Sequence, residues 1–118
     1  MVQEPAEHRA REFALVMERG TEALRREIGY DPSRWVQMVR RYGAVEAAKR
    51  LLSSGDDTSA GLATLTMANR LDQSVEWFVL VYADLFEPEE RETAHRRLRL
   101  HDAPIDQWLR ERLGRRYP

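Results

Sequence analysis

The sequence contains no cysteine, and this absence excludes disulfides, thiolate metal sites and a cysteine nucleophile. It also has no long apolar run. The most apolar stretch, WFVLVY at 77–82, follows Glu76 and precedes Asp84, so it falls far short of the ~20 apolar residues that a membrane span requires. The first twenty residues carry charges throughout and lack the apolar segment of a secretory signal. We therefore expect a cytoplasmic protein that does not associate with membranes.

Motifs for catalysis and cofactor binding are also missing. The chain has no glycine-rich phosphate loop and no G-x-S-x-G nucleophile motif. Its three histidines, His8, His95 and His101, do not form the H-x-x-x-H spacing that places two ligands of one metal ion on a helix face. The sequence therefore predicts no metal and no cofactor, and it favours a protein without enzymatic activity.

Charge is abundant but unevenly distributed. Residues 1–90 carry 11 Lys and Arg against 16 Asp and Glu, whereas residues 91–118 carry 8 Arg against 4 acids. This basic end could contact nucleic-acid phosphates, although interleaved acids also suit a solvated helix face. The candidate basic face consists of Arg96, Arg97, Arg99, Arg110, Arg112, Arg115 and Arg116.

The spacing of apolar residues indicates helices along the whole chain. Apolar residues recur every three or four positions, and glycines such as Gly29 and Gly43 provide stops between the segments. We expect seven helices, at about 6–28, 32–42, 44–54, 62–71, 73–85, 88–100 and 105–113.

The segment at 73–85 needs separate treatment because WFVLVY also suits a strand. No second strand candidate is available to pair with it, and Asp72 stands before it as a helix cap. We therefore predict a helix that is apolar nearly all round, and such a helix is normally surrounded by others. The predicted fold is an all-α compact bundle of about six or seven short helices around a central apolar helix, residues 73–85.

Three stretches, GYDPSRWVQMVRRYGAVEAAKRLL, RLDQSVEWFVL and LFEPEERETAHRRL, resemble a family of short bacterial proteins. The pattern of that family runs Y-x-x-x-[FW]-x-Q-M, A-A-K-R-L-L, S-x-G-F-T-x-L-W-E, G-R-L-D-x-[ST]-V-E, L-F-x-x-E-E and A-x-x-R-L. The resemblance covers residues 12 to about 100 and implies a small helical fold with no known activity. We therefore divide the chain into a predicted helical domain at 1–102 and a predicted C-terminal helical extension at 103–118. The chain departs from the pattern at 62–67, and whether this alters function stays open.

The polar members of the resembled pattern form a candidate functional cluster: Lys49, Arg50, Arg70, Asp72 and Glu76. Three of these residues, Arg70, Asp72 and Glu76, place a cation and two carboxylates beside the predicted central helix. Such a trio could share a proton or bind a metal, but more often it is a helix cap with an ion pair. We favour the structural role.

The leading functional interpretation is a non-enzymatic protein-interaction or adaptor module. Trp77 and Leu80 lie off the main apolar face of the central helix, and surplus apolar surface usually finds a partner. The partner is another protein or a second copy, and we expect a homodimer through 104–113. The apolar stripe of that segment is Ile105, Trp108, Leu109 and Leu113. A nucleic-acid-binding regulator using the arginines is the alternative, and an enzyme at Arg70, Asp72 and Glu76 comes last.

Overall fold

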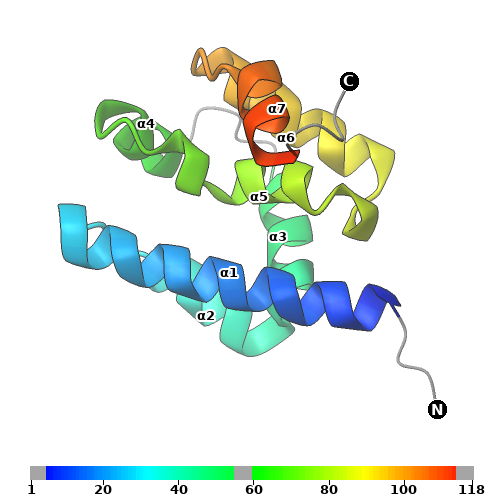
Figure 1. Ribbon diagram of the computed structural model, residues 1–118. Coiled ribbons are helices and arrows are strands. Elements are labelled where there is room, and N and C mark those ends of the chain that lie inside the picture. The colour runs from blue at the N-terminus through cyan, green and yellow to red at the C-terminus, as the bar shows by residue number, and fades with distance from the viewer. Residues whose placement is uncertain (1–4, 55–59, 114–118) are drawn as a thin grey trace.

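The computed structural model describes residues 5–54 and 60–113, and within these ranges the chain is helical without a strand (Figure 1). The all-α prediction is therefore confirmed. The elements are α1 Pro5–Ile28, α2 Ser33–Tyr42, α3 Ala44–Leu52, α4 Ala60–Met67, the 3₁₀ turn η1 Leu71–Gln73, α5 Val75–Val81, the 3₁₀ turn η2 Ala83–Leu85, α6 Pro88–Leu100 and α7 Ile105–Leu113.

Local sequence signals explain where the first three helices begin and end. Gly29 follows α1 with a φ of +68°, a left-handed conformation that glycine adopts without a steric penalty. Asp31 Oδ1 then accepts a hydrogen bond of 3.1 Å from the backbone N–H of Ser33, the first residue of α2. Gly43, with a φ of +84°, separates α2 from α3. These three boundaries agree with the sequence prediction to within one or two residues.

The central position of the segment around α5 is confirmed, but the segment is not one continuous helix. Figure 1 shows α5 between α1 on one side and α6 with α7 on the other. The Ser74 backbone is extended, with φ −76° and ψ 156°, and its Oγ accepts a hydrogen bond of 3.1 Å from Trp77 N. Ser74 is therefore the N-cap of α5. The prediction that Asp72 is the cap is wrong, because Asp72 lies in η1 and its side chain is exposed.

The fourth helix also ends earlier than predicted. α4 stops at Met67, and Asn69 adopts a left-handed φ of +58° before η1 begins at Leu71. Met67 itself is 90% exposed and does not join the interior. The turn at Asn69 redirects the chain, so that Leu71 reaches the interior through η1.

The interior contains two clusters of buried apolar side chains. The first cluster surrounds α5, and its aromatic members interlock: the Phe13 ring lies edge-on to Tyr82 and Phe86, with centroid distances of 5.6 and 5.5 Å. The second cluster is smaller. Its buried members are Leu24, Leu62, Leu65 and Leu71.

The last helix packs on the same interior. Ile105 is buried in the first cluster, and the Trp108 ring lies edge-on to Trp77 at a centroid distance of 5.3 Å. Trp77 is consequently only 4% exposed, and Leu80 is half-buried against the first cluster. Of the two apolar side chains that appeared surplus in the sequence, Trp77 is covered by the chain's own helix α7 and Leu80 packs against the first cluster.

Candidate binding cleft

The five residues of the candidate polar cluster do not form one site, and two of them pair separately on α3. Lys49 Nζ lies 2.8 Å from Glu90 Oε1 of α6. Arg50 Nε lies 3.5 Å from Glu46 Oε1, one turn earlier on α3, and its guanidinium stacks over the Tyr42 ring at 3.8 Å. Each cation therefore has a partner within the described residues.

The trio of Arg70, Asp72 and Glu76 is also dispersed. Arg70 Nη2 pairs with Glu27 Oε1 of α1 at 2.5 Å. The Asp72 side chain is exposed, whereas Glu76 is only 4% exposed and faces the interior. Within the described part of the chain, no hydrogen bond joins Asp72 to Glu76. The arrangement of two carboxylates around one proton or metal is therefore not formed by this pair.

The predicted basic face loses one member to the interior. Arg97 is 2% exposed, so the assignment of this residue to a solvated face is wrong. Arg99, Arg110 and Arg112 are exposed and Arg96 is half-buried. Arg115 and Arg116 lie outside the described residues.

The predicted dimer stripe is used within the chain. Ile105 is buried, and Trp108 and Leu109 are half-buried against the first cluster. Leu113 ends α7, and its side chain lies outside the described residues. Homodimerisation through 104–113 stays a prediction.

Arg97 joins three helices around a buried carboxylate. Its Nη1 donates to Glu76 Oε2 at 3.4 Å and to the carbonyl oxygen of Leu51 at 3.2 Å, and its Nη2 donates to the carbonyl of Leu52 at 3.3 Å. These carbonyls belong to the last turn of α3, where helical backbone oxygens lack partners within the helix. Arg97 of α6 therefore ties the end of α3 to Glu76 of α5.

In the Glu76–Arg97 pair, burial has the largest effect on the pKa of Glu76. Loss of hydration raises the pKa of Glu76, and its own backbone N–H, Arg97 and His101 oppose that rise. Burial likewise raises the pKa of Tyr30, and the nearby charges of Glu76 and Asp31 raise it further. The Tyr30 hydroxyl therefore lies near both the Glu76 and the Asp31 carboxylates.

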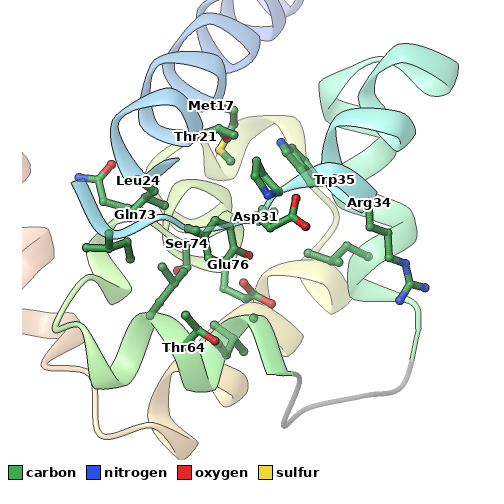
Figure 2. Close-up of a pocket in the computed structure, with 18 of the residues that line it drawn as sticks. Met17, Thr21, Leu24, Asp31, Arg34, Trp35, Thr64, Gln73, Ser74 and Glu76 are labelled. Carbon is green, nitrogen blue, oxygen red and sulfur yellow. The ribbon is translucent and has the colours of Figure 1, made fainter. Parts of the chain in front are cut away.

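These three residues line a cleft of about 620 Å³ (Figure 2). Its walls come from α1, the α1–α2 connection, α2, the end of α3, α4 and the start of α5. Figure 2 shows Glu76 between Asp31 and Thr64 of α4. The apolar part of the lining includes Met17, Leu24, Trp35, Leu62, Leu65 and Val75, and the polar part includes Thr21, Asp31, Thr64, Gln73, Ser74 and Glu76.

Sequence reasoning missed the Glu76–Arg97 pair and the cleft. The pair left no local signal, because Glu76 and Arg97 lie 21 positions apart and Arg97 is one of several arginines in its segment. The cleft left no local signal, since its lining residues are spread along the chain from Met17 to Glu76.

No family model, curated protein or solved structure matches the chain. Among residues 5–54 and 60–113, no group of three or more histidine or acidic side chains is placed to hold a metal ion. No helix in these ranges is long and apolar enough to cross a membrane.

Proposed function

We propose that this protein is a non-enzymatic interaction module that binds an apolar segment of a partner protein in the cleft beside α5. The observation that carries the proposal is the cleft itself. Its volume of about 620 Å³ lies within the range of about 300–1,000 Å³ that is common for binding sites. Its lining combines many apolar side chains with a few polar groups, which is the composition that gives affinity and orientation together.

The shape of the lining favours a protein segment. Helices α1, α2 and α4 form its sides, and Leu62 and Leu65 face it from one side of α4 while Trp35 faces it from α2. Helical walls of this kind accept apolar side chains spaced along a partner helix or an extended peptide. The proposal moves the binding surface away from the α7 stripe, because Trp108 already covers Trp77.

The competing functions have less support from the same geometry. An enzyme at Arg70, Asp72 and Glu76 would require these groups to converge, but Arg70 pairs with Glu27 and Glu76 pairs with Arg97. A nucleic-acid surface would require the arginines to be available together, but Arg97 is buried. We therefore place the function at the cleft.

A selection experiment with a blocked cleft tests the proposal. Random twelve-residue peptides displayed on phage are selected on the intact protein, and each enriched peptide is synthesised and titrated against variants on α4. Thr64 lines the cleft and is exposed, so Thr64→Trp obstructs the site without altering the core. Ala63 is exposed on the same helix but is not part of the lining, which makes Ala63→Trp the matched control.

We expect peptides to bind the unaltered protein and Ala63→Trp equally, and to lose at least about tenfold in affinity for Thr64→Trp because the ring occupies the site. Thermal melting of both variants verifies that each remains folded. Selection that enriches no peptide, or peptides that bind Thr64→Trp as well as Ala63→Trp, would reject the cleft as the interaction site.

A further inference from the structure

The described lining of the cleft contains two acids and one cation, with Glu76 buried and Asp31 exposed to solvent. Asp31 and Glu76 contribute carboxylates, and Arg34 contributes a guanidinium. Figure 2 shows the Arg34 side chain extending outward from α2, away from Asp31 and Glu76. The cleft therefore presents the buried carboxylate of Glu76 and, on its solvent-exposed side, the carboxylate of Asp31.

Arg97 compensates Glu76 only partly. The Arg97 Nη1 that reaches Glu76 Oε2 at 3.4 Å also donates to the Leu51 carbonyl at the shorter distance of 3.2 Å, and Nη2 donates to Leu52. A carboxylate offers about four acceptor positions. The rise in the pKa of Glu76 has burial as its largest cause, which agrees with a charge that lacks full compensation. A further donor from a ligand would stabilise this carboxylate.

Asp31 provides the second carboxylate. Its Oδ1 accepts hydrogen bonds from the backbone N–H and the Oγ of Ser33, and both of these donors are neutral. No cationic side chain among the described residues forms a salt bridge with Asp31. Its charge is therefore available to a ligand that enters the cleft.

Aromatic side chains stand beside these acids. Trp35 and Tyr30 are half-buried and belong to the same lining. The face of an aromatic ring attracts a cation, and an apolar wall accommodates the methylene stem of a lysine while its ammonium seeks polar partners. Leu62 and Leu65 supply such a wall.

We propose that the partner segment presents a lysine to the cleft, with its ammonium held by Glu76 and Asp31 and its stem packed along the apolar lining. This inference rests on the proposed function and adds the chemistry that the site selects. Charge complementarity distinguishes a lysine from an uncharged apolar side chain of the same length.

The chemistry is tested with n-hexylammonium, a soluble analogue of the lysine side chain, and with the uncharged 1-hexanol. Each is titrated while the amide signals of Gln73, Ser74 and Val75 are followed by ¹H–¹⁵N NMR. We expect hexylammonium to bind about tenfold more tightly than hexanol, because only the ammonium gains charge-assisted hydrogen bonds. Equal affinities would overturn the lysine inference and leave the cleft proposal standing.

Variants of the two named acids, with one control, test whether these acids cause the preference. Asp31→Asn keeps an acceptor for Ser33 but removes the charge, so we expect the preference for hexylammonium to fall several-fold. Asp72→Asn makes the same change on an exposed residue outside the lining and is expected to have no effect. Glu76→Gln is a third variant, included only if its melting curve shows that it is folded. An unchanged preference in Asp31→Asn would remove Asp31 from the inference.

A peptide arm tests whether the ammonium comes from a protein. In the tightest peptide from the phage selection, each lysine is replaced in turn by norleucine, which has a similar stem and no charge. We expect one replacement to weaken binding about tenfold. Selected peptides that contain no lysine, or that tolerate every replacement, would overturn the inference without affecting the cleft. Failure of the peptides and of both small probes together would reject the cleft as well.

Discussion

The two apolar clusters differ in how completely they are enclosed. In the first cluster, α5 is covered by α1, α3, α6 and α7, and Phe13, Val79 and Leu98 have no exposed surface. In the second cluster, Leu62 and Leu65 are also buried within the chain, yet both form part of the cleft lining. Among the buried residues of the first cluster only Met17 lines the cleft, so this cluster is nearly closed, whereas the second has a side that opens to a concave surface.

This difference separates stability from binding. A closed cluster gains free energy from every apolar contact and offers nothing to a partner. A cluster with an open side gives up part of that gain and retains apolar surface that a ligand can bury. Glu76 stands at the junction, because it lines the cleft and pairs with Arg97, the neighbour of Leu98 in the closed cluster.

A matched pair of leucine truncations tests the comparison and should give the largest effect. We expect Leu98→Ala to lower the free energy of unfolding by about 4 kcal/mol, because it leaves an enclosed cavity in the first cluster. Leu65→Ala removes the same atoms beside the cleft, where neighbours or water can occupy the space, and should cost about 2 kcal/mol. Urea denaturation of both variants measures the two losses.

Equal losses in the two variants would show that the second cluster is as closed as the first. The peptide titration provides a second comparison. Leu65→Ala should weaken binding at the cleft, whereas Leu98→Ala, measured below its melting temperature, should not.

Replacement of Arg97 should have the next largest effect. Arg97→Met preserves much of the apolar stem but leaves Glu76 buried without its cation, and we expect a loss of about 3 kcal/mol. In the same variant the Leu51 and Leu52 carbonyls at the end of α3 lose the hydrogen bonds from Arg97, although Leu51 keeps the bond from Ser54 N. The free energy of unfolding from denaturant titration gives the total cost.

A double-mutant cycle separates the charge from the carbonyl bonds. In a Glu76→Gln background no buried carboxylate is left unpaired, so Arg97→Met should cost less than it does in the unaltered protein. An identical cost in both backgrounds would mean that the bonds to Leu51 and Leu52 account for the effect.

Much of the fold could be predicted because its signals are local. The helical spacing of apolar residues and the stops at Gly29 and Gly43 predicted the bounds of α1, α2 and α3 closely. The same spacing predicted the last helix, which begins at Ile105. The central place of 75–81 followed from its apolar surface on all sides. These features depend on residues within one or two helical turns of each other.

The site could not be predicted in the same way because its contacts are distant in sequence. Arg97 pairs with Glu76 across 21 positions and with the Leu51 carbonyl across 46. In the sequence it is one arginine among several, and only packing distinguishes it from exposed Arg99. Trp77 looked like surplus apolar surface for the same reason, since Trp108 covers it from 31 positions later.

The smallest effects concern the start of α5, where the open and the closed clusters meet. Ser74 Oγ accepts from Trp77 N and donates to the Leu71 carbonyl at 2.7 Å, so Ser74→Ala should lower the free energy of unfolding by about 1 kcal/mol. Ser74→Thr keeps the hydroxyl and should retain most of that stability. Asp72→Ala, at the position that the sequence suggested as the cap, should leave the melting temperature unchanged because Asp72 is exposed and does not cap α5. A larger loss for Asp72→Ala than for Ser74→Ala would return the cap to Asp72 and move the start of the central helix back towards residue 73.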